Sequence, residues 1–330
     1  MDIITGLPYF EINRIAAAED DPSNWGIKNY LPDSQRFPDD GAGVTVAVMD
    51  TGLLPHPEIA DRTIQHLNFA SDALNPNSSP HGTHVSSTIG GKSAKIGWAP
   101  KVEFVDLRIL DSSGSGSLSW TLEAGQWLLD NRDKFESLML NCSFGFTGRN
   151  DAIEKMFRDL HLAKISIFGA AGNTGATEYF YPGAYNNVCT VGAMTEQEQV
   201  ATFSTRNDQL DVIAAGTKIW GAFGMDSYAV FSGSSMASPQ VCGLAAVKES
   251  RKRFAKTFVD YISLVRTTAT DVDAVGFDKA SGFGRVTPNK FLTHKVTDDE
   301  TTFDPQVKPS LAFLVIIAIM LILIIVLAST

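Results

Sequence analysis

Four polar side chains that could do chemistry stand in short runs of small residues. They are Asp50 in DTG, His81 in HGTHV, Asn173 in AAGN and Ser235 in GSSMASP. A serine hydroxyl is a poor nucleophile at its own pKa and needs an adjacent base, which a histidine oriented by a carboxylate supplies. If the fold brings these side chains together, they predict nucleophilic catalysis of acyl transfer.

Each of these side chains taken alone has a simpler structural explanation. An aspartate at the end of a strand is commonly a turn cap, and a histidine before a glycine is more often a surface or core residue. His81 and His84 could form a metal pair, but the helical zinc pattern needs histidines four residues apart with a glutamate between them. Here the spacing is three, with Gly82-Thr83 between, so we expect no metal at this place. The case for catalysis depends on the combination of motifs.

The elements that must position these residues follow an alternating pattern. Short apolar runs predict buried strands at 44–50, 102–110, 138–141, 165–173 and 187–193. Apolar residues recur at helical spacing in 120–131 and 151–163. This alternation predicts an α/β fold, a mainly parallel sheet with helices on both faces. Chemistry collects at the carboxyl ends of the strands in such sheets, and Asp50 and Asn173 both fall there.

The four motifs, in the chain order Asp, His, Ser, resemble those of the subtilisin-like serine proteases, the subtilases. The similarity runs from about Val44 to Phe291. Further strings that agree are DSSGSGSLSW at 111–120, LNCSFG at 140–145, YPGAY at 181–185 and GFGRVTP at 282–288. The resemblance implies a subtilisin-like fold, a cis peptide bond before Pro182, and a serine endopeptidase that hydrolyses peptide bonds through an acyl-enzyme intermediate.

The resemblance also implies a role for each of the four side chains. Ser235 would attack the peptide carbonyl, His81 would take its proton and later deliver it to the leaving amine, and Asp50 would fix the imidazole tautomer. Asn173 would complete the oxyanion hole together with the backbone N–H of Ser235. Ser235 would also open a tightly packed helix of small residues, whose N-terminus favours developing negative charge.

The resemblance implies that an extended peptide substrate binds as an added strand between two segments, Ser115-Gly116-Ser117 and Ser143-Phe144-Gly145. A third segment, Ala170-Ala171-Gly172, would form one wall of the pocket for the residue before the scissile bond. Phe180 falls where many relatives have a small residue at the pocket floor. With its ring turned inward the pocket is shallow and rejects large aromatic side chains, whereas a ring turned outward leaves it open.

No cofactor is required for this chemistry, and we expect no tight calcium in the loop after His81. Many subtilases bind calcium in this stretch, but GGKSAKIGWAP at 90–100 is shorter and carries two lysines where oxygen ligands would be needed. Glu58 remains as a leftover ligand, so a weak calcium site stays open.

The C-terminal segment differs in kind from the rest of the chain. Residues 311–328 are 18 consecutive apolar residues without charge, Pro or Gly. As a helix they would span about 27 Å, close to the hydrocarbon core of a bilayer. We expect a single-pass transmembrane helix at 311–328, joined by an acidic linker at 294–310 to a catalytic domain at 37–293. No secretory signal is visible at the start, so we expect the catalytic domain to face the cytoplasm.

The first 36 residues form an N-terminal extension. Its segment Gly6-Leu7-Pro8-Tyr9-Phe10 resembles the Pro-Tyr segment in the short propeptide of intracellular subtilisins, which lies across the active site and blocks it. A tethered peptide acts at high effective concentration, so even weak strand addition would occupy the cleft. The alternative is an ordinary arm that packs Leu7, Tyr9 and Phe10 on the domain surface.

Composition narrows the classes of partner. The chain has 330 residues, 27 basic and 37 acidic, and its net charge of −10 argues against binding nucleic acid by its phosphates. Three cysteines, at 142, 189 and 242, are too few for a disulfide scaffold and are expected as reduced buried thiols. A basic cluster after Ser235 predicts a solvated helix end, or contact with anionic lipid headgroups. Its members are Lys248, Arg251, Lys252, Arg253 and Lys256.

Two rival functions stay open beside a membrane-tethered endopeptidase. The first is a non-catalytic scaffold that retains the fold, which the presence of all four motifs disfavours. The second is a peptide ligase that passes the same acyl-enzyme to an amine, and nothing in the sequence separates it from hydrolysis.

Overall fold

The computed structural model describes residues 24–30, 37, 39–93, 95–251 and 259–296, and the backbone alone at 3–4 and 11–16. The transmembrane helix expected at 311–328, most of the expected linker, and Gly6–Phe10 lie outside the described residues. Among the helices that are described, none is both long and apolar enough to cross a bilayer.

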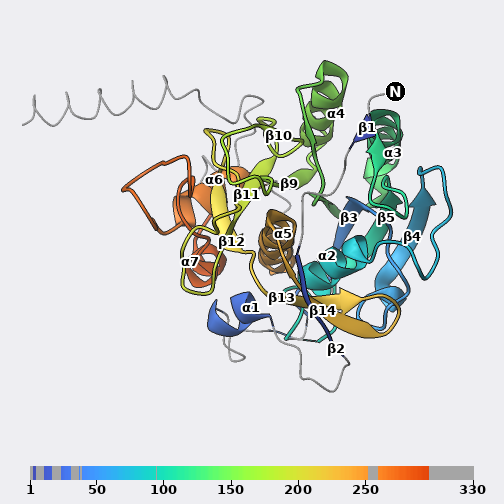
Figure 1. Ribbon diagram of the computed structural model, residues 1–330, viewed down its shortest axis with the longest axis horizontal. Coiled ribbons are helices and arrows are strands. Elements are labelled where there is room, and N and C mark those ends of the chain that lie inside the picture. The colour runs from blue at the N-terminus through green and yellow to red at the C-terminus, as the bar shows by residue number, and fades with distance from the viewer. Residues whose placement is uncertain are drawn as a thin grey trace, which may run out of the picture.

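A seven-stranded parallel sheet forms the centre of the molecule (Figure 1). Its order is β12 (Val212–Ala215), β11 (Cys189–Met194), β9 (Ser166–Ala170), β7 (Ser137–Cys142), β3 (Val44–Asp50), β5 (Glu103–Arg108) and β4 (Thr63–Asn68). Every residue of β3 is buried, because the middle strands of a parallel sheet are covered on both faces and therefore read as continuous apolar runs. The predicted α/β fold with a mainly parallel sheet is confirmed.

The helices divide between the two faces of this sheet. In chain order they are α1 (Trp25–Tyr30), α2 (His81–Gly90), α3 (Leu118–Asn131), α4 (Asp151–Leu162), α5 (Ser234–Ser250), α6 (Tyr261–Thr268) and α7 (Pro288–Thr293), with short 3₁₀ turns at Ala60–Arg62 and Arg132–Lys134. Along β3, Val46 and Val48 join the apolar cluster that contains α2 and α5. Ala47 and Met49 join the cluster that contains α3 and α4. The two-residue alternation of the strand thus supplies two cores.

Three small antiparallel sheets lie outside the central one. β6 (Gly116–Ser117) pairs with β1 (Ile3–Ile4), and β8 (Phe146–Thr147) pairs with β10 (Phe180–Tyr181). The hairpin of β13 (Ile219–Phe223) and β14 (Ser227–Ser232) gains a third strand, β2 (Glu11–Ala16). Two stretches of the N-terminal extension therefore add as strands to the rest of the protein, one of them to a predicted substrate-binding segment.

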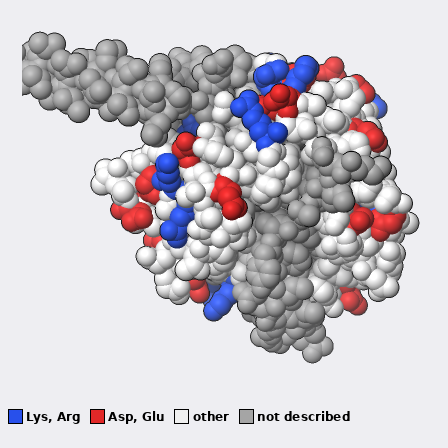
Figure 2. Space-filling view, turned by 45° about the horizontal axis from the view of Figure 1, so that its top comes forward, with Lys and Arg blue, Asp and Glu red and all other residues white. Residues whose placement is uncertain are grey.

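Charged side chains of both signs are interspersed on the face shown in Figure 2. Two members of the basic cluster also have structural partners. Lys248 is buried and its Nζ donates to the carbonyl oxygens of Leu292 (3.0 Å) and His294 (2.5 Å) at the end of α7. Arg251 donates two hydrogen bonds of 2.8 Å to the carboxylate of Asp40. The solvated position predicted for Lys248 is wrong, whereas Arg251 is exposed as predicted, and 252–256 lie outside the described residues.

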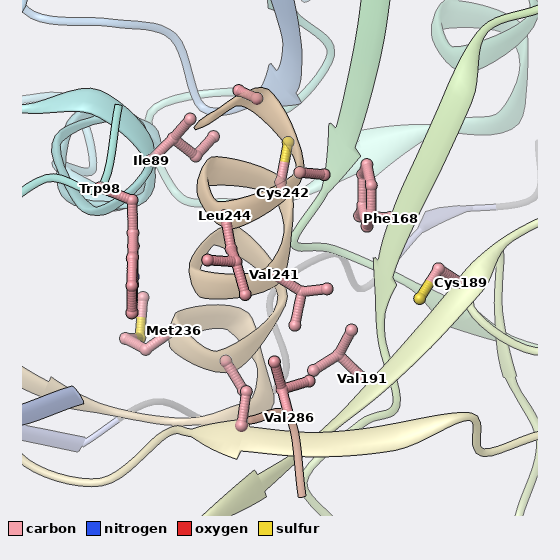
Figure 3. Packing of buried hydrophobic residues seen from close by; sticks show 14 of the residues in the cluster. Ile89, Trp98, Phe168, Cys189, Val191, Met236, Val241, Cys242, Leu244 and Val286 are labelled. Carbon is pink, nitrogen blue, oxygen red and sulfur yellow. The ribbon is translucent and has the colours of Figure 1, made fainter. Parts of the chain in front are cut away.

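Helix α5 is packed on all sides, as its small residues predict. Figure 3 shows its side chains between Ile89 of α2 and Phe168 and Val191 of the sheet. A methyl group on the Cα of Gly243 would lie 2.6 Å from the carbonyl oxygen of Ile89, so glycine is what allows the two helices to approach. All three cysteines are buried and none of them forms a disulfide with another, as expected.

Helix α1 packs into the core, although the sequence analysis placed it in the N-terminal extension. Trp25 is 7% exposed and Ile27 is 1% exposed. The indole Nε1 of Trp25 donates to the carbonyl oxygen of Thr217 at 2.7 Å, and Asn24 exchanges hydrogen bonds of 3.2 Å with the side-chain amide of Gln240.

Candidate active site

Asp50 and His81 meet where β3 ends and α2 begins. The Nδ1 atom of His81 lies 2.8 Å and 3.0 Å from the two carboxylate oxygens of Asp50, and both residues are fully buried. The backbone N–H of Thr51 also donates to Asp50 Oδ1 at 2.7 Å, which fixes the carboxylate. A carboxylate at Nδ1 favours the proton on that nitrogen and leaves Nε2 as the basic one.

The turn after Asp50 holds the start of α2 in place. The hydroxyl of Thr51 accepts from the N–H of Gly82 at 3.0 Å and donates to the carbonyl oxygen of Ser79 at 2.9 Å. A methyl group on Gly82 would lie 2.7 Å from the carbonyl oxygen of Gly52, so only glycine permits this approach. The glycine after the histidine is thus explained by packing.

Ser235 lies in the first turn of α5 and is fully buried. Its hydroxyl donates to the carbonyl oxygen of Ser143 at 2.9 Å, and the hydroxyl of Ser143 donates back to the carbonyl oxygen of Ser235 at 2.9 Å. The amide Nδ2 of Asn141 donates to that second hydroxyl at 2.9 Å. This reciprocal pair joins the start of α5 to the predicted substrate segment that follows β7.

Asn173 is bound to the residue before Ser235. Its Oδ1 accepts from the N–H of Ser234 at 2.8 Å, and the hydroxyl of Ser234 accepts from the N–H of Gly172 at 3.1 Å. Because the oxygen of the carboxamide is held by α5, its Nδ2 donor lies on the opposite branch of the planar group. The arrangement joins the end of β9 to the N-terminus of α5.

The side chain of Phe180 is turned toward two of the predicted substrate segments. A methyl group on the Cα of Gly145 would lie 2.2 Å from its Cε1, and one on Gly172 would lie 3.1 Å from its Cβ and Cγ. The ring therefore lies against Gly145, and the base of the side chain lies against Gly172. Phe144 and Ala170, from the same two segments, are fully buried.

Both carboxylate oxygens of Glu58 accept from protein donors, one of them in the loop after His81. Its Oε1 accepts from the Tyr228 hydroxyl at 2.7 Å, and its Oε2 accepts from the N–H of Ser93 at 2.8 Å. Burial and this hydrogen bond raise the pKa of Tyr228. Among the described residues, no group of three or more His, Cys, Asp or Glu side chains could hold a metal ion. The expectation about calcium stays a prediction.

The Tyr181–Pro182 bond is cis, as expected.

His84 is a neutral core histidine. Its Nε2 lies 3.1 Å and 3.2 Å from the carbonyl oxygens of Ile219 and Ala229, and its ring stacks on Phe231 with centroids 4.3 Å apart. Burial lowers its pKa to about 3. These contacts support the reading that His81 and His84 are no metal pair.

Sequence reasoning missed one large buried group beside the site, Arg108. The strand pattern at 102–110 predicted an apolar element, and an arginine inside such a run was the signal that could have pointed to it. Charged residues are almost never fully buried unless their charge is paired, yet Arg108 is 1% exposed.

The sequence is similar to those of known proteins. Residues 41–284 match the model of the Subtilase family. The chain is 34% identical over 215 residues to the thermostable alkaline protease of Halalkalibacterium halodurans, an alignment that covers 64% of this chain and 58% of that protein. It is 31% identical over 251 residues to thermitase of Thermoactinomyces vulgaris, covering 74% of this chain and 87% of thermitase.

A third relative is an intracellular serine protease of Paenibacillus polymyxa. The two are 32% identical over 224 residues, which is 63% of this chain and 68% of that protein. The family match spans well over half of the sequence and includes the Asp50–His81 pair, Asn173 and Ser235. The chain therefore belongs to the subtilase family of serine endopeptidases.

Proposed function

We propose that this protein hydrolyses peptide bonds with Asp50, His81 and Ser235 as its catalytic triad. The observation that carries the proposal is the buried contact between His81 Nδ1 and both carboxylate oxygens of Asp50. It leaves Nε2 as the base for the Ser235 hydroxyl, which turns from the Ser143 carbonyl toward the imidazole when a peptide binds. The resulting imidazolium is stabilised by Asp50.

The oxyanion of the tetrahedral intermediate is bound by two donors. One is the backbone N–H of Ser235 at the N-terminus of α5, and the other is the Nδ2 group of Asn173. The hydrogen bond from Ser234 N–H to Asn173 Oδ1 supports this role, because it orients the carboxamide before substrate arrives. Preorganised donors of this kind are among the largest contributions to acyl-transfer catalysis.

The substrate residue immediately before the scissile bond is proposed to be small. The segments 143–145 and 170–172 form the walls of the pocket, and Phe180 occupies the space beside Gly145 and Gly172. A ring in this position leaves room for glycine or alanine and excludes a second aromatic ring. Upstream substrate residues pair with Ser115, Gly116 and Ser117.

The N-terminal extension is proposed to block the cleft until it is displaced or removed. Its support is that Ile4 pairs with Gly116, which lies in a predicted substrate segment, and that Glu11 pairs with Ser232, three residues before the proposed nucleophile. Six residues join these two strands. The full burial of His81 and Ser235 is also consistent with a covered site.

We further propose a membrane tether at residues 311–328, with the catalytic domain facing the cytoplasm. The support is the uninterrupted apolar run of 18 residues, together with a relative that is named an intracellular serine protease. Calcium is not assigned a role, since both oxygens of Glu58 accept from protein donors.

The test of the proposed activity is peptide turnover by the wild type and by Ser235→Ala. The wild type should convert an internally quenched peptide library to two products for each cleavage, with water added across the bond. Ser235→Ala should reduce turnover by about 10³-fold or more at an unchanged thermal midpoint. Turnover that persists in Ser235→Ala would contradict the assignment. Product masses showing joined peptides would favour ligation, and a folded chain that is inactive both with and without residues 2–18 would favour a scaffold.

A further inference from the structure

Arg108, at the end of β5, is a fully buried arginine whose guanidinium donors all have acceptors nearby. Its Nε donates to the carbonyl oxygen of Thr51 at 3.0 Å. Its Nη1 donates to Asn68 Oδ1 at 3.0 Å and to the carbonyl oxygen of Asp72. Its Nη2 donates to Asp72 Oδ1 at 2.6 Å and lies 3.4 Å from the Ser112 hydroxyl. One planar group therefore joins three separate segments of the chain.

The first of these segments carries the acid–base pair. Thr51, whose carbonyl oxygen accepts from Arg108, uses its N–H to hold Asp50 and its hydroxyl to hold Gly82, next to His81. The aliphatic part of Arg108 also lies under the turn, since a methyl group on Gly52 would lie 2.9 Å from its Cδ. A shift of Arg108 would thus move both ends of the Asp50–His81 contact.

The second connection leads to the proposed substrate edge. Asp72, held by Arg108, accepts from both the N–H (3.1 Å) and the hydroxyl (2.5 Å) of Ser112. Ser112 lies in the turn that leads into the substrate segment 115–117. This turn is closed by the N–H of Asp111, which donates to the carbonyl oxygen of Ser115 at 2.7 Å. The carbonyl oxygen of Ser112 also accepts from the N–H of Ser79, two residues before His81.

We propose that Arg108 is a positioning residue that aligns the Asp50–His81 pair with the substrate edge at 115–117. The proposal rests on the proposed peptidase function and goes beyond it, because Arg108 touches neither the reacting atoms nor the substrate. Only arginine supplies five N–H donors in a rigid plane. Lysine keeps the charge but cannot reach Thr51, Asn68 and Asp72 at once.

The test compares Arg108→Lys with a matched control, Arg266→Lys. Arg266 is likewise largely buried and pairs with an aspartate, donating from Nη2 to Asp211 Oδ1 at 2.5 Å, but it lies in α6 away from the proposed site. The readouts are the thermal midpoint, kcat and KM on a peptide of at least four residues before the cleaved bond, and the rate of labelling by a small fluorophosphonate, which does not use the edge strand.

Arg108→Lys should lower kcat/KM by about tenfold or more, raise KM, and slow labelling, whereas Arg266→Lys should lower only the thermal midpoint. Equal kinetics for the two variants would overturn the positioning role. If Arg108→Lys does not fold, Asp72→Asn replaces it and should raise KM with little change in labelling, since Asp72 lies on the substrate side. An unchanged KM in Asp72→Asn would also overturn the proposal. A folded chain that is labelled neither with nor without residues 2–18 would contradict the proposed function itself.

Discussion

At the scale of single residues, the proposed chemistry depends on side chains that hydrogen bonds hold in place. Asp50 is held by Thr51 and His81, while Asn173 is held by Ser234. The pairing of Asp50 with His81 was predicted from the resemblance to subtilases, whereas the contacts of Thr51 and Ser234 were not. The contacts of Arg108 could not be predicted, since four of its five acceptors lie on Thr51, Asn68 and Asp72, which are 36 to 57 residues away in the sequence and become neighbours only in the folded chain.

Phe180 gives the sharpest test at this scale. Phe180→Gly should open the pocket for the substrate residue before the cleaved bond. It should raise the kcat/KM ratio of Phe or Leu over Ala at that substrate position by about tenfold or more, because burying a large apolar side chain contributes several kcal/mol. Peptides that differ only at that position measure the ratio. Tyr179→Ala is the control, since this neighbouring ring is 43% exposed and its hydroxyl donates to Asp208 instead. A wild type that already prefers Phe would refute the shallow pocket.

At the scale of elements, strong patterns were predictable and weak ones were not. Helix α4 was expected at 151–163 and is found at Asp151–Leu162, where Asn150 caps it by accepting from two backbone N–H groups at 3.1 Å. Strand β4 was missed because it is an edge strand whose residues are mostly exposed, so no apolar run marks it. The β13–β14 hairpin was also missed.

The N-terminal strands are the elements with the most direct consequence for activity. Deleting residues 2–18 removes β1 and β2 and should raise the initial rate on small peptides and abolish any lag, because a tethered segment competes at high effective concentration. Progress curves measure both. Ile4→Pro is the matched point variant: proline has no backbone N–H and is disfavoured within a strand, so it should weaken the pairing with β6 and release the block in part. No gain from a truncated chain with a normal thermal midpoint would rule out inhibition.

At the scale of the whole molecule, one parallel sheet with a core on each face brings the residues of the proposed triad, together with Asn173, to the ends of neighbouring elements. Strands β3 and β9 end at Asp50 and just before Asn173, and α2 and α5 begin at His81 and Ser234 on the same face. This convergence could be predicted from the general rule for parallel sheets. Strand β1 of the extension could not, since a two-residue strand has no periodicity.

The proposed tether is also a property of the whole chain. The full chain should float with phospholipid vesicles in a density gradient, whereas a chain ending at residue 296 should stay at the bottom, because 18 apolar residues are enough to span a bilayer. Neutral vesicles without anionic lipid should suffice. Equal flotation of the two proteins would contradict a tether at 311–328.

The central claim is that Ser235 is a nucleophile activated by His81, and active-site labelling tests it most directly. A fluorophosphonate should modify Ser235 and no other serine, as read by peptide mass spectrometry on the chain with and without residues 2–18. Ser227→Ala should label normally, and His81→Ala should label about 10³-fold more slowly or worse. Labelling at another serine, or labelling of Ser235 that does not depend on His81, would contradict the account.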